Sequence, residues 1–496
     1  MSTNAPQERT AMPEAAKAAT DYCCVNCMAV LWENGTTELC CHGCGRSFPL
    51  INHIPVLTSR PREMLMVHLQ EFRQAQAALE KNRALLSESA LGKEAWGAAE
   101  RVQRMLHGMT RNLGLIEMFM KPIEEYLSRN KEQSSTLIDW ALAQNVGSAP
   151  QTMLPFFYQD WGRTRDFEEA ESLIVGALRE HSPDEKRVAI LGAGACGIAY
   201  ASAKHFGTVY GVDLSLPTLL IAQAILSGHP IEVYVANAGW RRAQLTPPEP
   251  ANNQIRLLTA DIGTLPFAEV SLSAVVTQYL MDIAGDPLGV AAEIQRVLKP
   301  GGIWVNFSNP FRIPGDPPEI GPPEPSELPE LFEPLGLDII KIQRTRFTLQ
   351  NLDQIYAGGH RNAQEIHFFV ARKAARSPGI ATQKRFQIWK RENGDSWWQL
   401  IPKIIPGREI QIIRKRVLGP GGIEDRTEIG LNAVSFGVSG EHTTFVEALF
   451  GQMDGKHTLQ EILHNLVEQG IPMSNTQFRE LIHGLLNQYC VISLDH

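Results

Sequence analysis

The chain has 496 residues, enough for three or four domains, and its 44% hydrophobic and 20% charged content is typical of a soluble globular protein. Its net charge of −8 at pH 7 argues against a protein that binds nucleic acid through bulk positive charge. No apolar run approaches the roughly 20 residues that cross a membrane, and residues 1–20 lack the apolar core of a signal peptide, so we expect a cytoplasmic protein that begins with a disordered tail.

A cluster of cysteines follows the tail, because six of the eight fall between residues 23 and 44. They include two C-x-x-C pairs, Cys24 with Cys27 and Cys41 with Cys44. Two such pairs joined by a β-hairpin can bring four thiolates into a tetrahedron around Zn²⁺, which is then structural because no coordination position stays open. Cys23 and Cys40 offer shifted ligands, but neither begins a C-x-x-C pair. We predict a zinc ribbon over residues 21–60 that needs its metal to fold; the alternative is a ribbon that has lost the metal or forms disulfides on isolation.

The second cysteine pair runs into an apolar tail that contains two prolines, Phe48-Pro49-Leu50 and then Ile54-Pro55-Val56-Leu57. With this tail, the ribbon resembles the small zinc-ribbon activator of tRNA and translation-factor methyltransferases. The resemblance leaves open whether the ribbon binds a partner or only stabilises the rest of the chain.

Residues 61–150 follow a helical pattern, with apolar residues recurring at helical spacing. We expect a helical connector or cap whose methionines pack in a core. The connector leads to Tyr158, Asp160 and Trp161, a polar and aromatic cluster directly before the next predicted strand. We expect this cluster to close over a cofactor pocket, with Tyr158 in contact with the cofactor.

The segment 188–213, VAILGAGACGIAYASAKHFGTVYGVD, reads as a buried strand, a glycine turn, a small-residue helix and a second strand that ends in an acid. Gly192, Gly194 and Gly197 have G-x-G-x-x-G spacing, which allows a tight turn and close backbone approach to a ligand. Asp213 can accept hydrogen bonds from both hydroxyls of a ribose. The unit predicts an adenosine-containing cofactor without saying which one.

Polar side chains recur at the tips of the next two predicted strands. Asp261 and Ile262 follow the third strand and lead into Leu-Pro-Phe, and a carboxylate there can accept from the adenine amine. Gln278 and Tyr279 follow the fourth strand, and a later helix runs into Leu-Lys-Pro-Gly-Gly at 298–302. The glycine turn, the acids at the strand ends and the Leu-Lys-Pro-Gly-Gly segment, in this order, resemble the class I S-adenosylmethionine-dependent methyltransferases. A Rossmann dehydrogenase and a degenerate, non-catalytic methyltransferase fold are the alternatives.

This resemblance implies an α/β fold with a Rossmann-like class I methyltransferase core over residues 151–374. It also implies S-adenosylmethionine as the cofactor. The residues that we expect to bind it are Tyr158, Gly192, Gly194, Gly197, Asp213, Asp261, Ile262 and Gln278.

A narrower resemblance extends from residue 158 to residue 373. It rests on Q-D-W at 159–161, V-V-T-x-x-x-x-D-I-A at 275–284, L-K-P-G-G-I-W-V-N at 298–306, S-E-L at 326–328 and F-F-V-A-R-K at 368–373. These motifs resemble the carnosine N-methyltransferase-like family, which methylates an imidazole nitrogen of a histidine-containing peptide. The resemblance implies that Asp282 faces the substrate imidazole.

The chain departs from that family where the methyl acceptor would bind. Residues 306–312 read N-F-S-N-P-F-R in place of the family's N-L-G-P-L-L-Y-H, and Gln364 replaces a tyrosine. The residues of the acceptor pocket therefore differ from those of the family. His360 and His367 are the nearby histidines that could substitute for the family's histidine. The catalytic residues that we expect are Asp282, Tyr279 and Asn306. Asp282 would orient the acceptor N–H or act as a base, or else cap the helix that follows.

The last part of the chain is predicted to be a separate domain. Residues 375–404 read as a polar linker, and residues 405–496 resemble a PqqD-like winged helix, the element that recognises leader peptides in enzymes that modify ribosomally made precursors. Such domains add the peptide as an extra strand at a sheet edge; the alternative is a winged helix used for dimerisation or packing. DNA binding is disfavoured because the presumed recognition helix, 475–488, carries a single Arg and no Lys.

Together these features predict a methyltransferase that acts on a nitrogen of a peptide or peptide-like natural-product precursor, with a leader peptide bound at the C-terminal domain. One alternative is a small-molecule methyltransferase acting on oxygen or nitrogen. Another is a non-catalytic scaffold that senses the cofactor and binds a partner. We expect no nucleic-acid or membrane partner, and the oligomeric state stays open, with a homodimer as one alternative.

Overall fold

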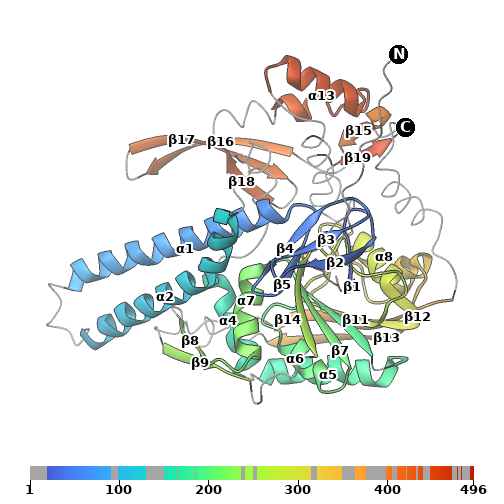
Figure 1. The fold of residues 1–496 in the computed structure, drawn as a ribbon, viewed down its shortest axis with the longest axis horizontal. Helices are drawn as coiled ribbons and strands as arrows, with labels where there is room; N and C mark the ends of the chain where they lie inside the picture. Colours follow the sequence, from blue (N-terminus) through green and yellow to red (C-terminus); the bar gives the residue numbers. More distant parts are fainter. Residues whose placement is uncertain are drawn as a thin grey trace, which may run out of the picture.

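The structure is a computed structural model, shown as a ribbon in Figure 1. It describes residues 19–90, 99–129, 150–162, 165–184, 186–235, 241–247, 249, 254–313, 321–348, 363–375, 398–404, 410–419, 422–431, 434–438, 447–471, 478, 482 and 492–495. Among these residues, no helix combines the length and the apolarity that crossing a membrane requires.

A mixed sheet of the described strands organises the fold. Its parallel part consists of β6 (Arg187–Leu191), β7 (Thr208–Asp213), β10 (Ile255–Ala260), β11 (Leu272–Gln278) and β12 (Leu298–Ser308). The spatial order is β10-β7-β6-β11-β12, followed by antiparallel β14 (Ala363–Lys373) and β13 (Leu337–Thr348). The chain therefore builds outward in one direction from β6 and in the other from β11. The strand order reverses between them, and in such sheets a ligand binds in the crevice at the carboxyl ends.

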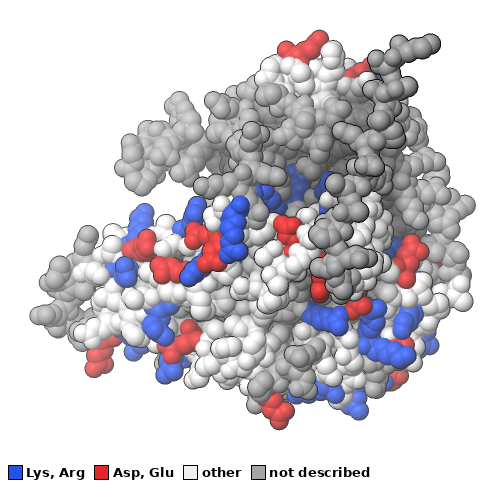
Figure 2. All heavy atoms as spheres, viewed as in Figure 1, with Lys and Arg blue, Asp and Glu red and all other residues white. Residues whose placement is uncertain are grey.

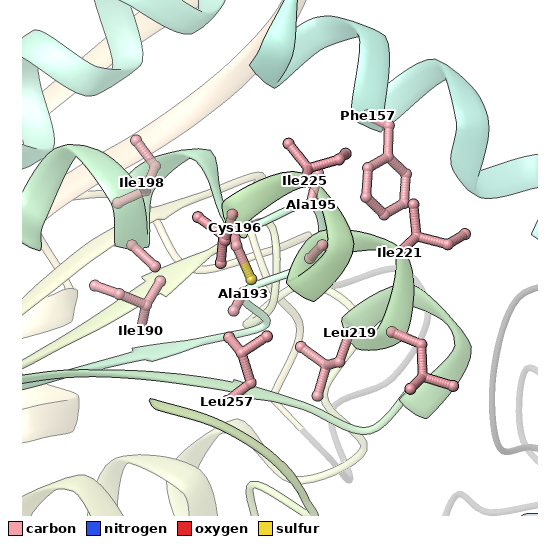
Figure 3. Close-up of a cluster of buried hydrophobic side chains, with 14 of the residues drawn as sticks. Phe157, Ile190, Ala193, Ala195, Cys196, Ile198, Leu219, Ile221, Ile225 and Leu257 are labelled. Atoms are coloured by element: carbon pink, nitrogen blue, oxygen red, sulfur yellow. The ribbon is translucent and has the colours of Figure 1, made fainter. Parts of the chain in front are cut away.

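Helices cover both faces of this sheet, which is why its central strands are buried on both sides. Alternate residues of β6 enter different cores, Val188 and Ile190 one and Ala189 and Leu191 the other. The first core receives α4 (Pro150–Trp161), α5 (Arg165–His181), α6 (Gly197–Ala203) and α7 (Leu216–Leu226). Figure 3 shows Phe157 of α4 reaching toward Ile221 and Ile225 of α7. The second core receives α8 (Pro287–Val297), α9 (Leu328–Phe332) and the adjoining 3₁₀ turn η3 (Glu333–Leu335).

The cysteine-rich segment extends the same sheet. Its strands are β1 (Ala19–Cys23), β2 (Val30–Asn34), β3 (Glu38–Cys41), β4 (Ser47–Ile51) and β5 (Ile54–Leu57), each antiparallel to the next. β5 pairs in parallel with β10, with Val56 opposite Thr259 and Leu57 opposite Ala260. The apolar tail noted in the sequence thus covers a sheet edge that would otherwise be open. Within this chain, the ribbon packs directly against the core.

Two long helices, α1 (Pro61–Ala90) and α2 (Ala99–Arg129), lie side by side (Figure 1). Asn112 of α2 joins them to the hairpin of β8 (Ile231–Val235) and β9 (Arg241–Leu245): its amide donates to the Tyr234 carbonyl at 2.8 Å and accepts from the Tyr234 N–H at 3.0 Å. Figure 2 shows Lys and Arg interspersed with Asp and Glu over the two long helices, consistent with the 3.1 Å ion pair of Arg73 on α1 and Glu124 on α2. On this face, the described residues of α1 and α2 present no patch of a single sign.

The described C-terminal residues form two small sheets and a helix. β15 (Ile401–Ile404), which occupies the last four residues of the expected linker, pairs with β19 (Ile492–Asp495). β16 (Ile410–Gly419), β17 (Gly422–Leu431) and β18 (Val434–Val438) form an antiparallel sheet. α13 (Leu459–Glu468) begins with a capping box between Thr458 and Glu461. Most of 475–488 lies outside the described residues, so the winged helix stays a prediction, as do the domain boundaries.

Candidate active site

The glycine turn lies at the carboxyl end of β6. Gly192 and Gly194 have φ angles of +67° and +49°, in the left-handed region that favours glycine. A Cβ on Gly192 would lie 3.2 Å from the Leu280 side chain and 3.3 Å from the Gln278 carbonyl, so the turn packs tightly against the end of β11. A Cβ on Gly194 would meet nothing closer than 3.8 Å. The backbone at Gly194 is therefore the part of the turn that a ligand can approach.

Asp213 closes the other side of this turn. One carboxylate oxygen accepts from the Gly194 N–H and the other from the Ser215 N–H, both at 2.8 Å. Burial raises the pKa of this carboxyl above its ordinary value. Each carboxylate oxygen has a second lone pair, so Asp213 can hold the turn and still accept from two hydroxyls. This arrangement fits the ribose of the cofactor.

Asp261 lies one strand further along, after β10. It accepts from the Gly263 N–H at 2.8 Å, and burial raises its pKa. The predicted neighbour Ile262 is half-buried against the second core. Two residues that the sequence reasoning missed hold this loop: Glu293 accepts from the Leu265 N–H at 3.0 Å, and Arg296, paired with Glu293 at 2.8 Å, donates to loop carbonyls. The spacing of Glu293 and Arg296 on α8 was the signal for this i, i+3 pair.

Helix α4 is attached to the glycine turn by two consecutive side chains. The Trp161 indole N–H donates to the Ala195 carbonyl at 2.9 Å, and an Asp160 carboxylate oxygen accepts from the Gly197 N–H at 3.0 Å. Burial raises the pKa of Asp160 to about 7. Tyr158, the expected cofactor residue of this cluster, is half-buried and packs against the first core. The polar contacts to the turn come from Asp160 and Trp161.

The third glycine has a steric role at this junction. A Cβ on Gly197 would lie 2.7 Å from both the Asp160 carboxylate and the Phe167 ring. We expect Gly197→Ala to lower the free energy of unfolding by about 1–3 kcal/mol because α4 and α5 must move away. Gly176→Ala on α5 is the matched control, since a Cβ there meets no atom within 4 Å and alanine is the better helix former. Thermal unfolding of both variants checks this, and an unchanged Gly197→Ala protein would contradict it.

Asp282 lies beyond the carboxyl end of β11. One oxygen accepts from the Asn309 side-chain amide at 2.7 Å, and the other is buried with no hydrogen-bond partner among the described residues. Burial raises the pKa of Asp282. The helix cap considered for Asp282 is supplied by another residue: α8 begins at Pro287, and Asp286 accepts from the Gly289 N–H at 3.0 Å. The geometry therefore leaves an Asp282 oxygen available for a ligand.

Tyr279 directly follows β11 and precedes Asp282 in the chain. It has a left-handed φ of +48°, and its ring packs edge-on against Phe307 at a centroid distance of 5.4 Å. Burial, together with the charges of Asp160, Asp166 and Asp282, raises the pKa of its phenol. Tyr279 thus lies near the carboxylates of both Asp160 and Asp282.

Asn306 links neighbouring strands of the sheet through its side chain. Its side chain is fully buried, accepts from the Thr277 hydroxyl at 2.8 Å and donates to the His367 carbonyl at 2.8 Å, so it joins β11, β12 and β14. These bonds occupy both ends of the amide, and the catalytic role of Asn306 stays a prediction. The missed residue here is Ser308, whose hydroxyl accepts from the Leu280 N–H at 3.2 Å and the Met281 N–H at 3.3 Å and so fixes the loop before Asp282.

The histidines considered as substitutes differ in position. His360 lies outside the described residues. His367 is 3% exposed, opposite Ser308 in the sheet, and its Nε2 lies 3.3 Å from a Glu365 oxygen. Burial lowers its pKa, so His367 is neutral at pH 7.

The four predicted metal ligands, Cys24, Cys27, Cys41 and Cys44, gather with all sulfur atoms within 4.8 Å of one another. Cys24 and Cys44 are 3.6 Å apart, and Cys27 and Cys41 are 3.3 Å apart. A tetrahedron of thiolates around Zn²⁺ has sulfurs roughly 3.8 Å apart, so the cluster could hold a metal ion of this kind. Cys40 lies outside it, with its thiol 3.4 Å from the Ser47 hydroxyl, and Cys23 is buried and also outside.

One segment of the chain matches a known protein family. Residues 190–306 match the protein family described as a methyltransferase domain. A search of curated proteins found no match. Among solved structures, the chain is similar to a protein described as a methyltransferase from Bacillus halodurans, with 15% identity, a TM-score of 0.29, and coverage of 40% of this chain and 99% of that chain. It is also similar to a chain of the complex between a methyltransferase activator and a methyltransferase from Haloferax volcanii, with 18% identity and a TM-score of 0.30. That match covers 44% of this chain and 96% of that chain.

The assignment rests on the family match and on the site, which agree in their residues. The matched segment contains the glycine turn, Asp213, Asp261 and Asp282. The expected α/β core is present, and its sheet combines a parallel part with antiparallel β14 and β13. The chain therefore carries an S-adenosylmethionine-dependent methyltransferase domain and is an enzyme of that class.

Proposed function

We propose that this enzyme transfers a methyl group to a nitrogen atom of a peptide or peptide-like natural-product precursor. The observation that carries the nitrogen assignment is Asp282, with one oxygen held by Asn309 and the other buried without a partner among the described residues. A buried carboxylate oxygen is costly unless a donor meets it. An acceptor N–H supplies that donor, and the raised pKa of Asp282 suits it to take up the proton.

In the proposed site, one group of residues binds the cofactor and another binds the methyl acceptor. Bound S-adenosylmethionine supplies a methyl group on a positively charged sulfur. The Gly194 backbone and Asp213 would hold its ribose end, and Asp261 its adenine. Tyr279 and Asp282 would border the acceptor nitrogen, orient its N–H and receive its proton. The buried loop from Leu280 to Asp282, fixed by Ser308, would exclude water from this step.

The peptide assignment draws on the C-terminal part of the chain. β16 and β18 are the outer strands of their sheet, and each is paired on one side only among the described residues. An extended leader peptide can add to such an edge. A homodimer and the small-molecule alternative stay open beside this proposal.

A transfer assay with methyl-labelled S-adenosylmethionine tests the proposed acceptor. Synthetic peptides that contain histidine, lysine or a free N-terminus are compared with imidazole and simple amines. Mild base releases a methyl ester, and tandem mass spectrometry of a base-stable product identifies the atom that carries the methyl group, which we expect to be a nitrogen of histidine, lysine or the N-terminus. Transfer to the small amines alone would favour the small-molecule enzyme, and base-labile label would contradict nitrogen as the acceptor.

For the ribbon, we propose a structural Zn²⁺ held by Cys24, Cys27, Cys41 and Cys44. The spacing of their sulfur atoms supports it, and a reducing cytoplasm, our proposed location, would keep these thiols free of disulfides.

A further inference from the structure

Asp160 has a charge that its structural contact does not require. Helix α4 is already attached to the turn by Trp161, which is 8% exposed, donates to the Ala195 carbonyl and packs edge-on against Tyr200 at 5.5 Å. The bond from the Gly197 N–H to Asp160 adds one contact. A neutral asparagine at this position could accept the same hydrogen bond, so the attachment of α4 does not explain a carboxylate.

The surroundings of Asp160 disfavour a negative charge. The charge of Glu171 on α5 acts on Asp160. Asp160 and Asp213 together act on the Cys196 thiol at the turn, and Asp160 also acts on the Tyr279 phenol after β11. Asp166 and Asp282 also act on Tyr279. In the part of the chain that the structure describes, no lysine or arginine is among the groups that shift the pKa of Asp160. A buried carboxylate among like charges is costly unless a cation meets it.

The order of the side chains along the sheet indicates which cation this is. Asp261 follows β10, Asp213 follows β7, and the glycine turn follows β6, so the adenine and ribose contacts run in strand order toward β11. Asp160 lies further in that direction, between Gly197 at the end of the turn and Tyr279 after β11. The amino-acid portion of the cofactor is the part beyond the ribose, and it carries an α-ammonium group.

We propose that Asp160 binds the α-ammonium group of S-adenosylmethionine, and that this cation is the ionic partner of the Asp160 carboxylate. The inference rests on the cofactor assignment above. The helix that carries Asp160 precedes the segment that matches the methyltransferase domain, so α4 completes a cofactor site that the family match contains only in part. A charge-assisted hydrogen bond of this kind is about twice as strong as a neutral one.

The test is calorimetric titration of the full-length, zinc-loaded protein with two ligands at pH 6 and pH 8. S-adenosylhomocysteine has the α-ammonium group, whereas 5′-methylthioadenosine lacks the whole amino-acid portion. In Asp160→Asn, we expect about tenfold weaker binding of S-adenosylhomocysteine at pH 8 and unchanged binding of methylthioadenosine. The loss shrinks at pH 6, because Asp160 in the wild type, with a pKa of about 7, is then mostly protonated. Glu169→Gln, which removes an exposed charge that pairs with Arg165 on α5, is the matched control and should bind both ligands like the wild type.

Three results would overturn the proposal. One is an affinity of Asp160→Asn for S-adenosylhomocysteine within twofold of wild type at pH 8. A second is an equal loss for methylthioadenosine, which would indicate a structural role. The third needs no variant: a wild-type preference for S-adenosylhomocysteine over methylthioadenosine that does not rise between pH 6 and pH 8. A wild type that binds neither ligand would instead contradict the cofactor assignment itself.

Discussion

Replacing Asp282 with asparagine is expected to lower kcat/KM for methyl transfer by about 10²–10⁴-fold, the usual contribution of a general base. Asparagine keeps the size of the side chain but cannot take up the proton of the acceptor nitrogen. Because the proposed partner of Asp282 is the acceptor and not the cofactor, the affinity for S-adenosylhomocysteine should stay close to that of the wild type. Steady-state kinetics with a peptide acceptor and a separate cofactor titration measure the two effects.

Asp286→Asn is the matched control for this variant. Asp286 lies four residues away and caps α8 through the Gly289 N–H, and asparagine is an equally good cap. Its activity should stay within about twofold of wild type, by the near equality of the two caps. Full activity in Asp282→Asn, or an equal loss in Asp286→Asn, would remove Asp282 from the proposed chemistry.

Cys41→Ser is expected to release the zinc and unfold the ribbon, since zinc contributes about 10–16 kcal/mol of apparent binding free energy in small zinc domains. Unfolding of the ribbon should also disturb the cofactor site. β5 is paired with β10, and the Cys23 N–H donates to the Pro266 carbonyl at 2.9 Å, in the loop that follows Asp261. We therefore expect a lower melting temperature and weaker binding of S-adenosylhomocysteine together.

Metal analysis and thermal unfolding check this, with Cys40→Ser as the control. Cys40 lies on the same strand as Cys41, but its thiol faces the Ser47 hydroxyl outside the cluster. Cys40→Ser should keep one zinc per chain and the wild-type melting temperature. Zinc retained by Cys41→Ser, or lost from Cys40→Ser, would contradict the assigned ligands.

The parts of the site that are local in the sequence could be predicted. The glycine turn and Asp213 lie within one strand-turn-helix-strand unit, and the positive φ angles of Gly192 and Gly194 are what their spacing indicates. The cysteine pairs are local too, and the structure brings together the four that begin and end C-x-x-C pairs. The cap of α8 could have been read as well, because Asp286 directly precedes Pro287 in the pattern of a helix start.

The parts that depend on distant strands could not be predicted. The Ile-Pro-Val-Leu tail reads as a strand, but nothing local says that it pairs with β10, about 200 residues later. Asn306 is among the expected catalytic residues, and nothing local indicates that the register with β11 and β14 buries its amide against Thr277 and the His367 carbonyl. Among the described residues, the position of α4 on the turn gives the polar contacts to Asp160 and Trp161, whereas Tyr158 packs against the first core.

The central claim, an S-adenosylmethionine site built on the turn and Asp213, is tested most directly by calorimetric titration with S-adenosylhomocysteine. The wild type and Asp213→Ala are compared. Alanine removes the acceptors for the Gly194 and Ser215 N–H groups as well as those for the ribose, and two lost charge-assisted bonds of about 1.5–3 kcal/mol each correspond to a loss of roughly 100-fold or more. We predict saturable one-site binding to the wild type and none measurable in Asp213→Ala. A folded, zinc-loaded wild type that does not bind, or an Asp213→Ala protein that binds equally well, would contradict the account.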